Sequence, residues 1–365
     1  MKTRFDNFLK KTSAAVNEYY SSLEFKYIAP PELKRGVGMY FERGGKRLRP
    51  GILSLCAGAT GGADAVLRAL PAACAVELYH NWTLIHDDLI DGDNVRRGGP
   101  SVHKATSDEM PELISGVISR EDADKYGAAN AILSGDALHA AAISVISSMK
   151  GVSDTIKLKL VTLMEDRLTG SLLEGEALDT RFGIVTKNLD SMLTITEDKI
   201  IDIMRKKTGE LFGYAAVCGA IIGLDLSDDS SEIPEALRGF AEDCGVAFQL
   251  ADDVLGIISD EETLGKPIGG DIREGKNTLV LRYGYNNASE DNKQILRSVV
   301  GNRNAGSDDI KKAVSILINS GGIEYAKKRG SEYIASARKK LTVVQDSEYK
   351  ELLNDWADMM IFRIR

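Results

Sequence analysis

The chain has 365 residues, of which 43% are hydrophobic and 27% are charged, enough to bury one large core or two. Its 46 basic and 54 acidic residues give a net charge of -8, which argues against a general nucleic-acid binder. The four cysteines show no close pairing in sequence, so neither a zinc site nor a disulfide framework is expected. The first residues lack a signal-peptide core, and no apolar run has the length of a membrane span, so we expect a cytoplasmic protein without a membrane span.

Apolar residues recur at helical spacing through most of the chain, and no alternating strand pattern is evident. The linkers are short, at 92–100, 223–234 and 264–270, so we expect a single all-α domain over residues 1–365, built as a helical bundle around a central cavity. The acidic, serine-containing segment 107–126 predicts an exposed surface insertion. Helices are expected at 5–25, 31–43, 48–59, 63–91, 128–149, 154–178, 189–223, 234–258, 275–286, 308–319, 321–341 and 347–362.

The first chemically informative segment is Gly44-Gly45-Lys46-Arg47-Leu48-Arg49-Pro50, a glycine turn with three cations before a proline. Proline at this place is typical of a helix start. The turn would suit a phosphate, but it is not a Walker A loop, because no Ser or Thr follows Lys46. Taken alone, such a string is more typical of a solvated surface turn than of a phosphate site.

Two aspartate-rich segments follow, Asp87-Asp88-Leu89-Ile90-Asp91 and Asp252-Asp253, each inside an apolar helical stretch. Burying so many carboxylates is costly unless cations neutralise them. On a helix the first three carboxylates fall within an arc of about 100°, which suits oxygen ligation of Mg2+. Because Mg2+ keeps several waters and takes few carboxylates, an incomplete protein shell is expected. The two segments predict one divalent-metal site.

Each acidic segment is followed by cations: Arg96 and Arg97 after the first, Lys266 and Lys276 after the second, with Lys207 between the two segments. Metal ions that bridge carboxylates to phosphate, with lysine and arginine on the remaining phosphate oxygens, would neutralise both components. This combination predicts a site that holds diphosphates.

These motifs, in this order, resemble those of the trans-isoprenyl diphosphate synthases, the head-to-tail prenyltransferases that include farnesyl and geranylgeranyl diphosphate synthases. The resemblance covers most of the chain and implies an isoprenoid-synthase-type bundle. It also implies condensation of isopentenyl diphosphate with an allylic diphosphate (dimethylallyl, geranyl or farnesyl), with release of diphosphate. The motifs that carry the resemblance are 44–50, His86 to Asp91, Arg96-Arg97-Gly98, Gly135-Asp136-Ala137-Leu138, Lys207-Thr208-Gly209, and Phe248-Gln249 leading into Asp252-Asp253.

The resemblance also implies roles for single residues. The metal-side carboxylates would be Asp87, Asp88, Asp91, Asp252 and Asp253, holding several Mg2+ ions for which Mn2+ can substitute. Asp87, Asp88, Arg96, Lys207, Asp252 and Lys266 would be the catalytic residues. The substrate-binding residues would be Lys46, Arg49, His80, Arg96, Arg97, Lys207, Thr208, Gln249, Lys266 and Lys276. A homodimer is also implied. The chain departs from the family pattern at Gly256, where the family usually has a third Asp.

Product length in this family is set by the side chains before the first acidic segment, here Tyr79, Trp82 and Thr83. The large Trp82 followed by the small Thr83 resembles archaeal-type geranylgeranyl synthases, so a C20 product is favoured, with C15 or a longer chain as alternatives. An ideal helix, however, points Trp82 away from the carboxylate face.

Two other functions are consistent with parts of the sequence. A helical metal phosphohydrolase of the HD type would use His80 and His86-Asp87, and a non-catalytic prenyltransferase subunit would account for Gly256 and the insertion. We expect His86 to make a core hydrogen bond, because carboxylates suit Mg2+ better. We also expect Asp88→Ala to reduce turnover and leave the fold intact, on the premise that Asp88 is a metal ligand with no role in packing.

Overall fold

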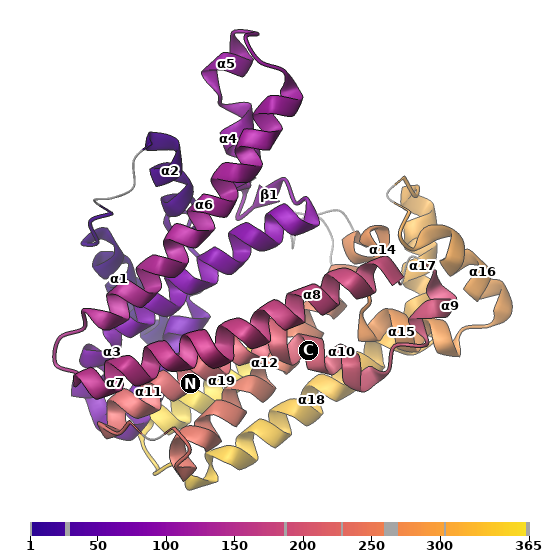
Figure 1. The fold of residues 1–365 in the computed structure, drawn as a ribbon. Coiled ribbons are helices and arrows are strands. Elements are labelled where there is room, and N and C mark those ends of the chain that lie inside the picture. Colours follow the sequence, from indigo (N-terminus) through magenta and orange to yellow (C-terminus); the bar gives the residue numbers. More distant parts are fainter. Residues whose placement is uncertain are drawn as a thin grey trace. The chain divides into compact units, whose positions relative to one another are not determined.

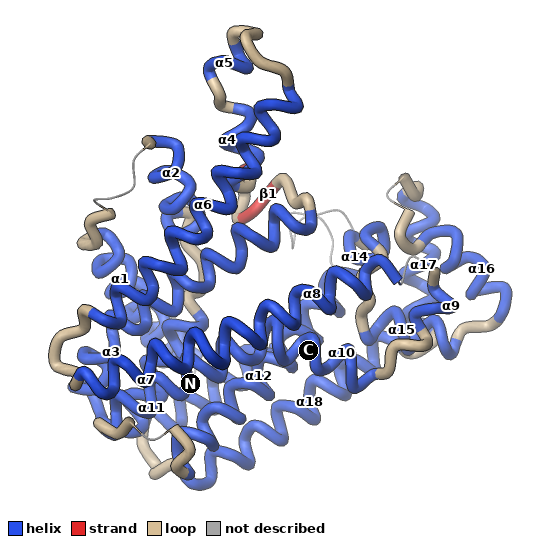
Figure 2. The backbone as a smooth tube through the Cα atoms, in the orientation of Figure 1, coloured by secondary structure: helices blue, strands red, loops and turns tan. Residues whose placement is uncertain are grey.

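The computed structural model describes residues 2–25, 30–185, 188–227, 229–258, 269–302 and 304–362. The chain folds into two compact units, Met1–Thr162 with Cys218–Asp229, and Leu163–Val217 with Ser230–Arg365. The single domain over 1–365 therefore stays a prediction. Across the described residues the only strands are two of two residues each, which confirms the all-α class (Figures 1 and 2).

The first unit is built on the long helix α3 (Leu48–Asp91), which packs against α1 (Lys2–Ser21), α2 (Pro31–Glu42) and α6 (Arg120–Ser147). Gly62 breaks α3 with non-helical φ and ψ of 71° and -166°, so the prediction of two helices, 48–59 and 63–91, is confirmed. The remaining helices of this unit are α4 (Val102–Asp108), α5 (Pro111–Ile114) and α7 (Asp154–Thr162).

A short antiparallel hairpin follows α3, with β1 (Val95–Arg96) paired to β2 (Gly99–Pro100). Its two-residue turn, Arg97-Gly98, has φ values of 52° and 73°, the positive values that such tight hairpin turns require. The turn chemistry therefore explains the glycine of the Arg96-Arg97-Gly98 motif, and it directs the two arginines back towards the end of α3.

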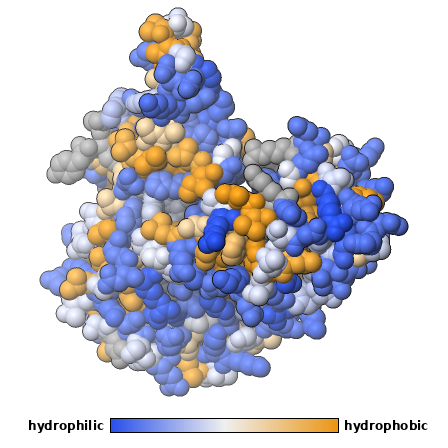
Figure 3. All heavy atoms as spheres, turned by 45° about the vertical axis from the view of Figure 1, so that its right-hand side comes forward, coloured by the Kyte–Doolittle hydropathy of each residue, from blue (hydrophilic) through white to orange (hydrophobic). Residues whose placement is uncertain are grey.

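The segment 107–126 is helical over much of its length, which the sequence did not lead us to predict. It includes the end of α4, all of α5 and the first turns of α6, and α5 lies at the end of the arm that α4 and α6 form (Figure 1). Most of its side chains are exposed, including Ile114 at 74% and Val117 at 75%. Figure 3 shows apolar side chains at the end of this arm.

Two helices of this unit, α3 and α6, are long and apolar enough to cross a membrane, contrary to our expectation that no run reaches that length. The core helices of soluble proteins can have the same length and composition. In the structure α3 and α6 pack against each other, and much of each apolar stretch is buried. The absence of a membrane span therefore stays a prediction.

The second unit is centred on α12 (Glu232–Ile258), which packs against α18 (Gly322–Lys340) and α19 (Glu348–Phe362). Two π-helical segments, η1 (Leu163–Thr169) and η2 (Arg205–Gly209), adjoin α8 (Gly170–Val185) and α11 (Glu210–Leu224); α11 continues into the first unit. The other elements are α9 (Leu189–Met192), α10 (Glu197–Met204), α14 (Gly270–Glu274), α15 (Leu279–Asn287), α16 (Glu290–Val299), α17 (Ser307–Asn319) and the 3-10 turn η3 (Leu341–Val343).

Two predictions about helices in this unit were wrong. The expected helix 189–223 is interrupted between α9 and α10, where the Thr196 side chain accepts a hydrogen bond from the Lys199 N–H and starts a new helix. Helix α16 was missed, because its sequence is mostly polar and only Leu296 and Val299 are buried. Ser289 caps its first turn by accepting from the Asn292 N–H.

A group of buried charges lies on α12, away from its acidic pair. Glu242 and Asp243 are both buried, and Arg205 lies 3.5 Å from Glu242 and 3.3 Å from Asp243. Burial raises the pKa of Glu242 to about 7, with a further contribution from Glu210. The native protein therefore holds a proton on Glu242 that the unfolded chain would already have released near pH 5.

This proton makes stability depend on pH. Because the native state binds it between pH 4.5 and about 7, we expect the free energy of unfolding to fall by about 2–3 kcal/mol as pH rises through that window. Glu242→Gln should flatten this dependence in urea unfolding measured from pH 5 to pH 8, whereas Glu121→Gln, at an exposed site on α6, should leave it unchanged. Equal slopes in Glu242→Gln and the unmodified chain would contradict this assignment.

Candidate active site

The end of α3 carries the first acidic segment, and its three carboxylates differ in access to solvent. Asp88 is fully buried, the Asp87 side chain is 22% exposed, and Asp91 is exposed. Gly92 ends the helix in the left-handed conformation at φ 70°, which glycine adopts without strain. Helical periodicity predicted one shared face but not this difference in burial.

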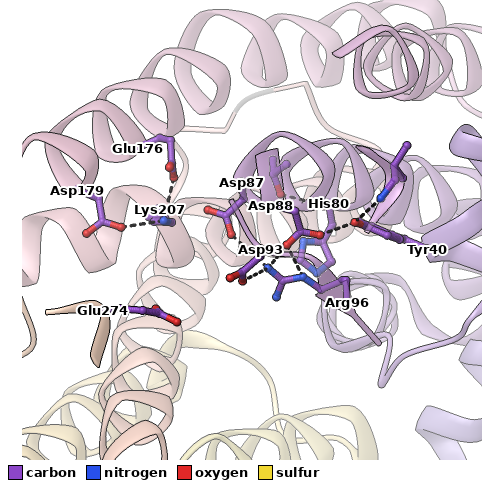
Figure 4. Close-up of polar contacts among 12 residues, drawn as sticks. Tyr40, His80, Asp87, Asp88, Asp93, Arg96, Glu176, Asp179, Lys207 and Glu274 are labelled. Atoms are coloured by element: carbon purple, nitrogen blue, oxygen red, sulfur yellow. Dashed lines mark hydrogen bonds and ion pairs between the residues drawn. The ribbon is translucent and has the colours of Figure 1, made fainter. Parts of the chain in front are cut away.

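Asp88 is held on both oxygens (Figure 4). Arg96 donates from Nε to Oδ1 at 2.6 Å, with a second short contact from Nη2, and the buried Tyr40 hydroxyl donates to Oδ2. The same hydroxyl accepts a hydrogen bond from the Val102 N–H at 3.1 Å. Burial raises the pKa of Asp88 while Arg96 and Tyr40 lower it, and burial prevails. Tyr40 was not identified from the sequence.

The three cations of the basic turn have different surroundings. Lys46 is exposed, whereas Arg47 is buried and pairs with Glu77 at 2.6 Å. Arg49 contacts His80 Nε2 at 3.0 Å. Burial, followed by the charges of Arg49 and Arg97, lowers the pKa of His80 well below its usual range, so His80 is neutral at physiological pH. Of the three cations only Arg47 is clearly structural.

Arg97, the second arginine of the hairpin, contacts the carbonyl oxygen of Tyr40 and lies 3.6 Å from Glu77. The structure therefore brings Arg49, His80, Arg96 and Arg97 together around α3. His80 lies about two helical turns before Asp87, and Arg96 lies 3.7 Å from the Asp87 carboxylate. An anion that reached this group would meet several cationic side chains beside the first acidic segment.

His86 accepts a hydrogen bond at Nδ1 from Trp82 Nε1 at 3.1 Å and contacts the Ile132 carbonyl oxygen at 3.2 Å through Nε2. The expected hydrogen bonding of His86 is confirmed, but its side chain is 27% exposed and so does not belong to the buried core. Gly135 on α6 leaves the room for it, because a Cβ there would lie 2.2 Å from His86 Nε2. The close approach of α6 to α3 thus explains the glycine of the Gly135-Asp136 motif.

The proposed chain-length residues lie on the same stretch of α3. Trp82 packs its ring on His139 of α6, with centroids 4.5 Å apart, and Tyr79 meets Trp82 edge-on at 4.8 Å. Thr83 donates to the His80 carbonyl oxygen at 2.8 Å. Trp82 therefore faces α6, in agreement with the expectation that it points away from the acidic face.

In the second unit, Lys207 forms ion pairs with Asp179 at 2.8 Å and Glu176 at 2.9 Å (Figure 4). Thr208 donates to Gln249 Oε1 at 2.9 Å, and Gln249 donates to Asp253 Oδ1 at 2.9 Å. Glu176 and Asp179 were missed from the sequence, although their i,i+3 spacing on α8 was a usable signal.

Lys207 and Thr208 belong to the π-helical segment η2, a geometry that recurs at functional sites. Two glycines allow neighbouring helices to approach it. A Cβ on Gly175 of α8 would lie 2.8 Å from Lys206 Cβ and 3.0 Å from the Lys207 nitrogen, and a Cβ on Gly245 of α12 would lie 2.7 Å from Gly209 Cα. The position of η2 therefore depends on backbone contacts from both sides.

Asp252 and Asp253 lie side by side in sequence but not in environment. Asp253 is buried, and its burial, together with the nearby Asp271 carboxylate, raises its pKa to about 8. Asp252 is partly exposed. Lys276 lies 3.1 Å from Glu274 and 3.7 Å from Asp271. Lys266 lies outside the described residues, so its predicted role is untested.

The donors at both acidic segments are carboxylate oxygens, which fit Mg2+ in chemical type. Among the described residues, no three His, Cys, Asp or Glu side chains form a group that could hold a metal ion. The expected Mg2+ site therefore stays a prediction.

A sequence profile described as polyprenyl synthetase matches residues 30–317. The chain belongs to the polyprenyl synthetase family. It is 36% identical over 334 residues to the geranylgeranyl diphosphate synthase of Methanosarcina mazei, covering 92% of this chain and 90% of that protein. It is 33% identical to the geranylfarnesyl diphosphate synthase of Aeropyrum pernix, covering 94% of this chain and 98% of that protein.

Comparison with solved structures supports the same family. The crystal structure of geranylgeranyl pyrophosphate synthetase from Pyrococcus horikoshii matches with a TM-score of 0.82 and 30% identity, covering 99% of this chain and 98% of that one. The predicted family and helical fold are confirmed, and the protein is a prenyl diphosphate synthase, a transferase. This match argues against the metal-phosphohydrolase alternative.

The ion pair between Asp88 and Arg96 changes what we expect of Asp88→Ala. Because the substitution would leave the buried Tyr40 hydroxyl and the partly exposed Arg96 without their shared partner, we now expect it to lower the free energy of unfolding by about 2–3 kcal/mol. Asp91→Ala, at an exposed position on the same helix, should cost less than about 1 kcal/mol. Urea unfolding of both variants measures the difference, and equal stabilities would contradict a structural role for Asp88.

The close contact at Gly175 predicts a second stability difference. Gly175→Ala should lower the free energy of unfolding by about 1–3 kcal/mol, because the new methyl group would force α8 away from η2. The matched control is Gly183→Ala on the same helix, where an added Cβ meets nothing within 4 Å. That change should stabilise the protein by about 0.5–1 kcal/mol. A neutral Gly175→Ala variant in thermal or urea unfolding would show that the contact is not constraining.

Proposed function

We propose that this prenyl diphosphate synthase condenses isopentenyl diphosphate with dimethylallyl, geranyl or farnesyl diphosphate, head-to-tail, and makes geranylgeranyl diphosphate. The observation that supports it best is the group of Arg49, His80, Arg96 and Arg97 around α3, within two turns of Asp87. Cationic side chains beside acidic ones are what a diphosphate with divalent metals needs. The M. mazei relative, a geranylgeranyl diphosphate synthase, supports the C20 product.

In this proposal the reaction is Mg2+-dependent, with several ions per site and Mn2+ as a substitute. Asp87, Asp91 and Asp252 would hold the ions, and bound Mg2+ would neutralise charge on the departing diphosphate. Arg96 and Lys207 would stabilise the same leaving group, with Lys266 and Lys276 as further contacts. Asp88 would position Arg96, and Asp253 would position Gln249.

The bond changes follow from the two substrates. The allylic carbon–oxygen bond breaks and diphosphate leaves with the electron pair. The double bond of isopentenyl diphosphate then forms the new carbon–carbon bond, and a proton is lost to regenerate an alkene. Lys46, Arg49, His80 and Arg97 would bind the isopentenyl diphosphate, with Thr208 and Gln249 as further contacts. The neutral His80 leaves the cationic charge on its arginine neighbours.

Product length remains part of the proposal. The Tyr79, Trp82 and His139 rings fill the space between α3 and α6, and in this position they would limit a growing chain. A product one isoprene unit longer than C20 is the alternative, supported by the A. pernix geranylfarnesyl diphosphate synthase; a C15 product has no such support here.

We also propose a homodimer and a cytoplasmic location, with no nucleic-acid partner. Ile132 and Leu133 on α6, exposed at 46% and 54%, are apolar side chains that suit a contact between subunits. A non-catalytic subunit is the competing function, and activity of the purified chain alone separates the two.

The test is incubation of the purified chain with Mg2+, labelled isopentenyl diphosphate and each of the three allylic diphosphates, followed by separation of the products by chain length. A C20 endpoint is expected. A C15 or longer endpoint would keep the chemistry and overturn the proposed product. No elongation from any starter, with folded protein, would contradict the proposed function and favour a non-catalytic subunit.

A further inference from the structure

The π-helical segment η2, which carries Lys207 and Thr208, is bounded by two charged residues. The Glu210 backbone N–H donates to the carbonyl oxygen of Arg205, five residues earlier, which is the hydrogen bond that defines a π turn. Because π turns are rare and occur mostly as single turns inside α-helices, contacts from outside the segment are expected to hold it. The side chains of Arg205 and Glu210 both make such contacts.

Four charged side chains form a ring of alternating sign beside this turn. Arg205 Nη1 lies 3.5 Å from Glu242 Oε2 on α12, and Glu242 Oε1 lies 3.6 Å from Arg167 Nη2 on η1. Arg167 Nε in turn lies 3.7 Å from Glu210 Oε2, and the π hydrogen bond between Glu210 and Arg205 closes the ring. Glu242 therefore links the two π-helical segments, η1 and η2, to each other and to α12.

The ring has room for the Glu242 side chain because a glycine of α11 lies against it. A Cβ on Gly213 would lie 2.7 Å from Glu242 Cγ and 2.9 Å from Glu242 Oε1. The residue is buried, and its Oε1 makes no hydrogen bond with the residues that the structure describes. The three ion pairs of the ring span 3.5 to 3.7 Å, beyond the usual length of an N–H···O hydrogen bond. The ring therefore depends on charge.

The charge of Glu242 depends on its neighbours. Burial, followed by the charge of Glu210, raises the pKa of Glu242 to about 7, against the opposing effect of the nearby arginines. The charged or titratable groups around it are Arg167 from η1, Arg205 from η2, Glu210 from α11, Arg238 and Asp243 from α12 itself, and Lys340 and Tyr333 of α18, which act on Asp243 and Arg205. Only the ionised carboxylate attracts both arginines of the ring.

We propose that Glu242 is a positioning residue: through its ring with Arg167, Arg205 and Glu210 it fixes the π turn of η2 and thereby the place of Lys207. This inference rests on the proposed function, in which Lys207 stabilises the diphosphate that leaves the allylic substrate. Glu242 acts through the backbone of η2 and touches no substrate. Because the reacting groups must be placed accurately, a small displacement of η2 should lower the rate.

The first measurement is hydrogen exchange of the backbone amides of η2 and the first turn of α11, followed by mass spectrometry on the full-length chain at pH 8. Glu242→Gln keeps the shape of the side chain and removes its charge, so these amides should exchange roughly 10-fold faster. Glu235→Gln is the matched control, because Glu235 lies on the same helix and pairs with Arg238 at 2.9 Å outside the ring. It should exchange as the unmodified chain does.

The second measurement is the pH dependence of elongation. Between pH 6 and pH 8 the Glu242 carboxyl, with its pKa of about 7, changes from mostly protonated to mostly ionised, so kcat should include a rise that Glu242→Gln lacks. At pH 8 this variant should have a kcat roughly 10-fold below that of the unmodified chain. At pH 6 the two should agree within about twofold, because both then lack the charge. A role in stability alone would lower kcat by the same factor at both pH values.

A second pair of variants tests the ring at another member. Arg205→Lys keeps a cation beside Glu242 and should retain most of the activity at pH 8, whereas Arg205→Gln should lose as much as Glu242→Gln does. The inference is overturned if Arg205→Gln elongates as fast as Arg205→Lys. It is also overturned if Glu242→Gln exchanges as Glu235→Gln does, or if it exchanges faster but keeps the pH profile of the unmodified chain.

Failure of this inference and failure of the proposed function give different results. A chain that elongates an allylic diphosphate, with Glu242→Gln equal to it in both hydrogen exchange and pH profile, would overturn the inference alone. A chain that elongates nothing, while Glu242→Gln and not Glu235→Gln speeds exchange in η2, would support the ring as the device that fixes η2 and contradict the proposed function.

Discussion

The ion pair between the buried Asp88 and the partly exposed Arg96 is the interaction on which the first acidic segment depends. An ion pair out of water is stabilising only when its remaining hydrogen-bonding positions are satisfied, and here Tyr40 takes the second carboxylate oxygen. The Tyr40 hydroxyl also accepts from Val102. The Asp88 carboxylate thereby connects α2, α3, the hairpin and, through Tyr40, the start of α4. A displacement of the acidic segment would therefore break contacts with each of these elements.

The second unit follows a similar principle with neutral groups. Thr208, Gln249 and Asp253 form a chain of hydrogen bonds between η2 and α12, and Gly175 and Gly245 let the flanking helices approach η2. In each Asp-Asp pair the second carboxylate is buried and engaged by protein groups, while the first is more accessible. The second aspartate of each pair therefore holds its surroundings in place, and the first is the one more exposed to solvent.

The basic side chains that gather near α3 differ in their charged neighbours. Burial, with the charges of Arg49 and Arg97, lowers the pKa of His80 and keeps it neutral. Arg47 is paired with Glu77, so the cationic side chains near α3 have different surroundings. On α12 the balance is reversed, since Asp253 has Asp271 beside it.

The sequence by itself determined the helical class, the two helices that meet at Gly62 and the presence of two acidic and several basic segments. Helical periodicity and residue chemistry are local properties, and they suffice for these features. It also led to the correct expectation that His86 makes hydrogen bonds. Interactions between residues distant in sequence could not be predicted from it. Tyr40 is 48 residues from Asp88, and Lys207 is 31 residues from Glu176 and 28 from Asp179. Asp271, whose carboxylate lies against Gly256, is 15 residues from it. Only tertiary structure decided which carboxylates are buried, because burial depends on the partner that packs over each helix face, and that partner comes from elsewhere in the chain.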